Sequence, residues 1–157
     1  MDLEQFAREL SSASATIATG LEAGFSVIVK EIEETAKEEI GVYQPAYGPF
    51  DAWAPLAEST KVDRVRSGYT EDDPLLRSGE LRDSIESEVV GLAAIVGTKS
   101  KIGLWQEVGT AHIPPRPFIG PAYLRKIDPL VESIGLTISQ GFKAWENKKT
   151  GSGGWPV

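Results

Sequence analysis

Residues 77–121 read RSGELRDSIESEVVGLAAIVGTKSKIGLWQEVGTAHIPPRPFIGP and decide the fold. Ile85, Ser87 and Val89 share one side of a predicted strand, and the apolar run LAAIVGT follows a turn at Val90-Gly91, so the pattern predicts a β-hairpin with a buried second strand. The next segment, IGLWQEVG, predicts a single-turn helix closed by Gly109. Prolines then bias 112–121 toward extended or polyproline geometry. The order is therefore hairpin, compact turn and stiff segment.

Upstream of this stretch, the sequence predicts one amphipathic helix from about residue 3 to residue 39. Gly41 is placed to end it. Gly20 and Gly24 lie inside it and mark a kink, a break or a close approach to another backbone. The predicted apolar stripe recurs at steps of mostly three and four residues: Leu3, Phe6, Leu10, Ile17, Leu21, Phe25, Ile28 and Ile32.

Downstream, a second helical stripe follows Pro121 and continues to Trp145. The pair Asp128-Pro129 suits an N-cap and a first helical position, so we expect the helix to restart there. We expect one domain over residues 1–148 and a flexible tail over 149–157.

Residues 42–76 are interpreted as a long loop. The segment VYQPAYGPF has two prolines and a glycine, so it fits neither a regular helix nor a central strand. Trp53 is the expected anchor. We expect part of the loop to order against neighbouring subunits, the alternative being a surface loop pinned by Trp53. After it, 76–85 predicts a short helix with Ser78 as its N-cap.

Composition limits the function further. The chain has 157 residues and no cysteine, so we expect a single domain without disulfides or thiolate metal sites. The acidic start MDLEQFAREL is unlike a secretory signal, and no run of 18 apolar residues is present. We therefore expect no membrane partner and assembly in the cytoplasm.

Charge is unevenly distributed along the chain, whose net charge is −7. Residues 1–40 hold nine acidic and three basic side chains, and residues 116–149 hold three acidic and six basic ones. An acidic chain without a basic cluster is not expected to grip DNA phosphates. The asymmetry indicates a solvated helix face with a lysine-lined helix end, or head-to-tail contact between subunits, or an acidic channel wall past which DNA slides.

The pieces LxxSGxLRDSI and EVGTxxxPPRPFIGPA, preceded by Trp53-Ala54-Pro55-Leu56 and Thr60, resemble in order and spacing the tail-completion (neck, or virion-morphogenesis) proteins of long-tailed double-stranded DNA bacteriophages. The resemblance covers about residues 52–147. It implies an α+β fold, with a long N-terminal helix and a C-terminal helix packed on a small antiparallel β-sheet, and long loops. It also implies a ring, commonly hexameric, in the neck or tail of the virion.

What the resemblance implies about function is structural. The ring would complete or terminate the tail and join it to the head around the DNA channel. Its partners would be other copies of itself, the tail tube protein and the head-closure or connector proteins, with DNA passing non-specifically through the lumen. Neither a cofactor nor a membrane is implied.

Candidate residues for subunit contacts follow from these motifs. A proline-flanked arginine is stiff and forks onto carboxylates, so Arg116 is expected to reach Glu107, either across subunits or as an intrachain pair. We expect Arg116→Ala and Phe118→Ala to fold but to fail in joining heads to tails. The candidate interface residues are Trp53, Arg77, Arg82, Trp105, Glu107, Pro115, Arg116 and Phe118.

An enzymatic function is the alternative. The acidic triplet Glu71-Asp72-Asp73 would hold Mg²⁺ in a metal-dependent nuclease or processing enzyme. A solvated acidic loop ended by Pro74 is the favoured interpretation, because no lysine or histidine stands nearby in sequence as a partner. His112 is the only histidine, and no Walker, GxGxxG or GxSxG motif is present. We therefore expect no catalytic residues, no metal and no enzymatic activity.

Overall fold

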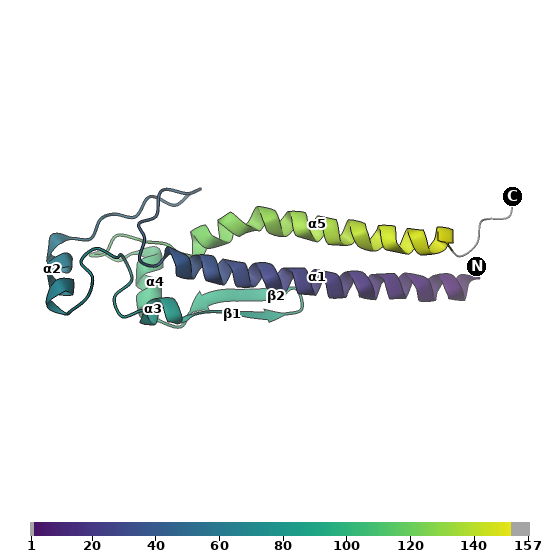
Figure 1. Cartoon of the computed structure of the whole chain (residues 1–157), viewed down its shortest axis with the longest axis horizontal. Coiled ribbons are helices and arrows are strands. Elements are labelled where there is room, and N and C mark those ends of the chain that lie inside the picture. The colour runs from purple at the N-terminus through teal and green to yellow at the C-terminus, as the bar shows by residue number, and fades with distance from the viewer. Residues whose placement is uncertain (1, 152–157) are drawn as a thin grey trace. The chain divides into compact units, whose positions relative to one another are not determined.

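The computed structural model describes residues 2–151, and their side chains as far as residue 147. It confirms the predicted α+β class, with a long helix at each end, a two-stranded antiparallel sheet and long loops (Figure 1). The elements, in chain order, are α1 (Leu3–Glu39), α2 (Glu58–Arg66), α3 (Glu80–Asp83), β1 (Ile85–Val90), β2 (Ala93–Thr98), α4 (Lys101–Val108) and α5 (Ile119–Gly151).

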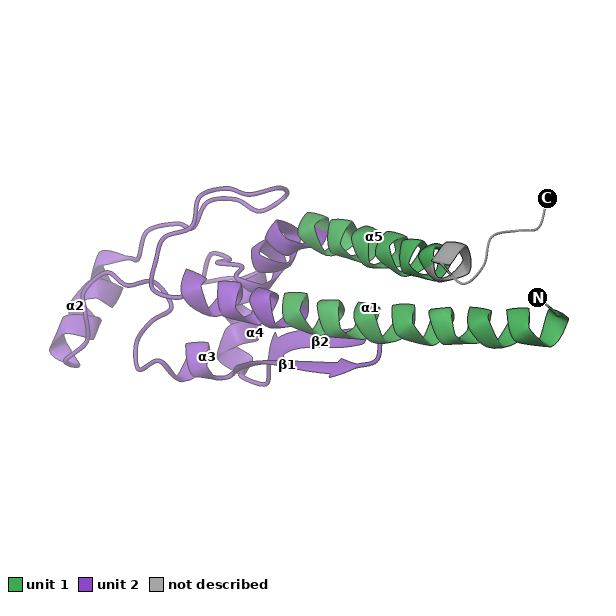
Figure 2. Cartoon of the chain, turned by 45° about the vertical axis from the view of Figure 1, so that its right-hand side comes forward, with its two compact units in different colours: residues 1–28, 128–157 green, residues 29–127 purple. Residues whose placement is uncertain are grey.

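The chain divides into two compact units, coloured in Figure 2. Unit 1 comprises residues 1–28 and 128–157, so its described part consists of helical segments of α1 and α5. Unit 2 comprises residues 29–127 and contains the hairpin, α2, α3 and α4. Both long helices therefore contribute to both units.

Within unit 1 the glycines mark close approach of helices. A Cβ on Gly20 would lie 3.0 Å from the Thr137 side chain, and one on Gly141 would lie 2.2 Å from Ile17. Since α1 is one helix from Leu3 to Glu39, the predicted break at Gly20 is wrong, and what approaches Gly20 closely is the Thr137 side chain. As predicted, Gly41 follows the helix end with a positive φ of 100°.

The predicted restart at residue 128 is wrong, because α5 runs through Pro129. Proline lacks the N–H that would bond the carbonyl four residues earlier, which normally weakens a helix. Ala122 before it and Leu130 after it are both buried, so packing on either side holds the helix together. At its far end α5 extends to Gly151, beyond the start of the expected tail, and residues 152–157 lie outside the described part.

Residues 42–76 are not all loop, since α2 forms at Glu58–Arg66. Its sequence has no apolar stripe, which is why the helix was not predicted. Arg64 anchors it: the guanidinium is buried and donates to the carbonyl oxygens of Thr70 at 2.7 Å and Leu76 at 2.6 Å. These bonds tie the helix to the chain that follows it.

The hairpin has the predicted boundaries and the register Val90↔Ala93 to Ile85↔Thr98. Gly91, with φ of 60°, begins the two-residue turn, as in turns of type II′. Ile85 is fully buried. The expectation of a buried second strand is wrong, however, because residues 93–95 of β2 are exposed. An apolar run therefore does not by itself imply burial, and nothing in the described chain covers these residues.

The short helix α3 forms where a helical turn was predicted, but its N-cap is Gly79 and not Ser78. Gly79 has a φ of 92°, which an L-residue adopts only with strain. The Ser78 hydroxyl still accepts a long bond of 3.4 Å from the Glu80 N–H. Ser78 therefore supports the turn from one position earlier.

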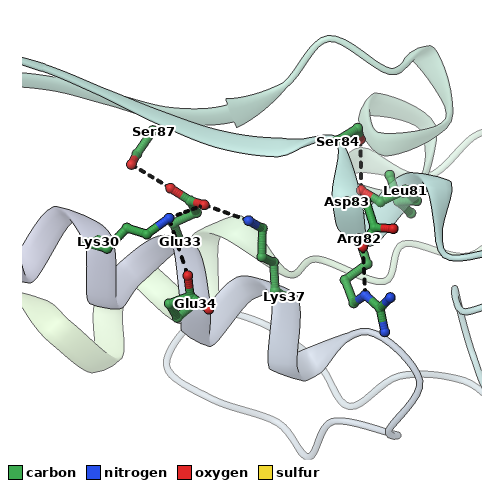
Figure 3. Close-up of polar contacts among 9 residues, drawn as sticks. All are labelled: Lys30, Glu33, Glu34, Lys37, Leu81, Arg82, Asp83, Ser84 and Ser87. Carbon is green, nitrogen blue, oxygen red and sulfur yellow. Dashed lines mark hydrogen bonds and ion pairs between the residues drawn. The ribbon is translucent and has the colours of Figure 1, made fainter.

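A buried carboxylate fastens the hairpin to α1 (Figure 3). Glu33 accepts hydrogen bonds of 2.6 Å from the ammonium groups of Lys30 and Lys37 and from the Ser87 hydroxyl of β1. Burial by itself raises the pKa of Glu33, but these three donors outweigh it and lower the pKa to about 2. The ionised form is therefore the one that the fold stabilises.

Acid is expected to weaken this connection. Because the folded pKa of Glu33 lies below its unfolded value, its stabilisation is present above about pH 4.5 and is lost as the pH falls toward 2. Half-exposed Lys30 is screened by solvent, so we expect Glu33→Gln to cost about 2 kcal/mol at pH 6 and much less at pH 2.5. Urea denaturation of both proteins at the two pH values measures this. An equal deficit at both values would contradict it.

Candidate functional site

The fold brings the three motif segments of the sequence together in unit 2. The indole Nε1 of Trp53 donates to the carbonyl oxygen of Pro117 at 2.9 Å. The backbone N–H of Arg116 donates to the carbonyl of Gln106 at 2.6 Å. Residues 53–55, 106–107 and 116–118 thus form one cluster, which we call the motif cluster.

Glu107 caps α5 from the end of α4. Its carboxylate accepts the N–H groups of Phe118 at 2.8 Å, Ile119 at 3.1 Å and Gly120 at 2.8 Å. These are N–H groups that a helix start leaves without an intrahelical partner. The helix dipole also favours a negative charge at this end. The carboxylate therefore fixes the position of α4 relative to the start of α5.

Arg116 does not pair with Glu107 within the chain, so the prediction of an intrachain pair is wrong. Its guanidinium is buried and donates to the carbonyl oxygen of Ala54 at 2.8 and 3.1 Å and to that of Pro55 at 3.2 Å. Burial lowers the pKa of Arg116. Glu107 is already occupied by the α5 backbone, and the carbonyls of residues 54 and 55 take the place of the expected carboxylate.

The eight candidate interface residues occupy different environments. Trp53, Arg116 and Phe118 are buried, and Glu107 is used as the helix cap. The remaining four are at least partly accessible: Arg77, paired with Asp63; Arg82, paired with Asp83; Trp105; and Pro115. The structure thus brings the buried members together in the motif cluster and leaves Trp105 and Pro115 at the surface.

The helix α4 turns its apolar side chains outward. Trp105 is 47% exposed and Val108 is 65% exposed. The inward side instead holds Gly103, packed against Thr98 and Leu81, and the half-buried polar pair Gln106 and Glu107. A surface helix usually has the opposite polarity. We call its exposed apolar residues the α4 face: Ile102, Leu104, Trp105 and Val108.

Among the residues of this face, the sequence predicts an interface role for Trp105 alone. The sequence places Ile102, Leu104 and Val108 only within the predicted helical turn IGLWQEVG. Their exposure follows from the polar pair Gln106-Glu107 on the opposite side of α4. Glu107 must point inward because it caps another helix. That partner helix begins more than ten positions later, so only the folded chain reveals the inversion.

No family model matches this chain, and comparisons with curated proteins and with solved structures found no match. Its function has to be argued from its own residues and their arrangement.

A second buried ion pair lies elsewhere in unit 2. Glu39, at the end of α1, is bonded through one oxygen to Arg125, and Arg125 also donates to the amide oxygen of Gln44 at 3.3 Å. Burial raises the pKa of Glu39 to about 7, against the opposing effect of Arg125. This pair connects the last turn of α1 to α5 and belongs to the interior of the unit.

The acidic triplet does not gather into a metal site. The Asp72 carboxylate accepts the Tyr43 hydroxyl at 2.6 Å and lies 3.6 Å from the Lys61 ammonium. Across the described residues, no group of three or more His, Cys, Asp or Glu side chains is arranged to hold a metal ion. Asp72 instead connects α2 to the preceding loop.

One helix of the described chain, α1, is long and apolar enough to cross a membrane, with a mean hydropathy of 1.3 over its best 18 residues. The helices of soluble cores and signal sequences meet the same criterion. Length and composition alone therefore assign α1 no membrane role.

Proposed function

We propose that this chain is a structural virion protein of the neck or tail end of a long-tailed bacteriophage, acting as a tail-completion or tail-terminator protein. It forms a ring, of six copies by the resemblance of its motifs, and joins the tail to the head around the DNA channel. Its partners are other copies of itself, the tail tube protein and the head-closure or connector proteins.

The observation that carries the proposal is the inverted polarity of α4. Large apolar side chains exposed together mark a surface that another protein covers. Tryptophan is enriched at the centre of such contacts, and the α4 face has Trp105 among its members. An exposed apolar surface lowers the solubility of a protein, and it is kept where a contact in an assembly requires it.

The net charge of the chain favours passage of DNA through the ring and not binding of DNA to its wall. A net charge of −7 offers little to displace the counterions of a phosphate backbone. DNA would therefore move through the ring without adhering to its wall.

Native mass spectrometry over a range of concentrations tests the ring. We expect a closed assembly near six times 17.0 kDa, or a monomer that reaches this mass when phage tails are added. Trp105→Ser is expected to lower the assembled fraction at least tenfold while leaving the monomer folded, because it removes the large aromatic side chain from the contact. Val62→Ser on α2, where Val62 is 55% exposed, is the control and should assemble normally.

A monomer that ignores both heads and tails at every concentration would overturn the proposed function. If Trp105→Ser assembled as well as the wild-type protein, the α4 face would not be part of the contact between subunits.

A further inference from the structure

The hairpin ends in a second apolar surface. Residues 89–98 contain no charged side chain and no proline. Around its turn, Val90, Leu92 and Ile95 are 72%, 57% and 73% exposed. We call these three residues the hairpin tip. Natural proteins usually protect such an edge with a charge or a proline, and this strand has neither.

The hairpin tip and the α4 face lie at opposite ends of the same hairpin (Figure 1). The turn is at Gly91-Leu92, whereas α4 follows the far end of β2 and packs Gly103 against Thr98. Six residues of strand, about 20 Å, separate the turn from the start of α4, and Ile95, the member of the tip nearest to α4, lies three residues before Thr98. Both belong to unit 2, so the tip of one molecule cannot cover its own α4 face.

Charged residues flank the two surfaces with opposite signs. Lys101 is exposed at the start of α4, and at steps of three, four and seven residues it shares a stripe with Leu104, Trp105 and Val108. Exposed Glu88 is the cross-strand partner of Ile95, so it borders the tip. A basic end on one surface and an acidic flank on the other suit a contact between two copies of this chain.

We infer that the hairpin tip of one copy docks on the α4 face of the next, with Glu88 beside Lys101 of that neighbour. The contact joins different surfaces of identical chains, so it is heterologous and propagates around a ring. This contact rests on the proposed ring and specifies how its subunits join.

Chemical cross-linking tests the contact directly, since the chain has no cysteine of its own. Leu92→Cys and Leu104→Cys are combined in one chain and treated with a short bismaleimide, which is less demanding in geometry than a disulfide. We expect a covalent ladder up to the size of the ring. Leu92→Cys combined with Val62→Cys, which places the second thiol on exposed α2, is the matched control and should give no ladder.

Charge reversal supplies an independent measurement. Lys101→Glu and Glu88→Lys should each weaken assembly about fivefold, as expected of one accessible ion pair, and the double variant should recover it. Recovery is expected if the two residues face each other in one contact between copies, and a double variant as weak as the single ones would contradict this.

Three results would overturn the inference. Ladders of equal yield in the α2 control would show cross-linking without a specific contact, and dimers from Leu92→Cys alone would show that the tips meet each other. If the wild-type protein assembles but the Leu92→Cys/Leu104→Cys protein gives no ladder, the proposed contact is excluded and the proposed ring is retained. A wild-type chain that stays monomeric with and without tails would overturn the contact and the proposed function together.

Discussion

Replacing Phe118 by alanine is expected to lower the free energy of unfolding by about 3–5 kcal/mol, the usual cost of truncating a fully buried phenylalanine. Phe118 has no exposed surface and is among the largest fully buried side chains of the described chain. It lies between Pro117, which accepts the Trp53 indole, and the start of α5. Loss of its ring would leave a cavity beside the motif cluster.

Urea denaturation followed by circular dichroism measures this effect. Phe142→Ala is the matched control, since Phe142 lies on the same helix and is 53% exposed. It should cost well under half as much. A loss below about 1 kcal/mol for Phe118→Ala would contradict its place in the core. The sequence predicted a folded variant that fails to join heads to tails, and the burial of Phe118 adds a large loss of stability to that expectation.

Replacing Glu107 by alanine is the second large change. Three backbone N–H groups at the start of α5 would lose their acceptor together with a favourably placed negative charge. Loss of a helix cap and exposure of unpaired donors each cost about 1–3 kcal/mol, and water replaces part of what is lost. We therefore expect a total loss of about 2–4 kcal/mol in the free energy of unfolding.

Two further variants separate the cap from the charge. Glu107→Gln keeps one acceptor oxygen and should cost about half as much as Glu107→Ala. Glu86→Ala removes an exposed strand carboxylate and should change stability by less than about 0.5 kcal/mol. If Glu107→Ala resembled Glu86→Ala, the carboxylate would not be needed to hold α4 on α5.

Burial was the property that local patterns predicted least well. The apolar run of β2 suggested a core strand, yet Ile95 is 73% exposed. Proline on both sides of Arg116 suggested an accessible side chain, yet it is buried. In both cases the outcome depends on whether another segment packs on the residue, and that segment is distant in sequence.

Several elements did follow from the sequence by itself, because their causes are local. Spacing of apolar residues at helical steps predicted α1, and alternation interrupted by Val90-Gly91 predicted the hairpin. Gly41 and Gly109 end α1 and α4 with the positive φ values that glycine tolerates. Each of these depends on residues within one or two turns of the chain.

Only the tertiary structure decided the partners and the exposed surfaces. Arg116 donates to Ala54, 62 positions earlier, and Glu107 caps a helix that starts more than ten residues later. The inverted polarity of α4 follows from that cap, because a helix that must point its glutamate inward points its apolar side chains outward. The free energy of folding depends on which groups are in contact in the folded chain. Contacts between segments that are distant in sequence do not follow from local sequence patterns.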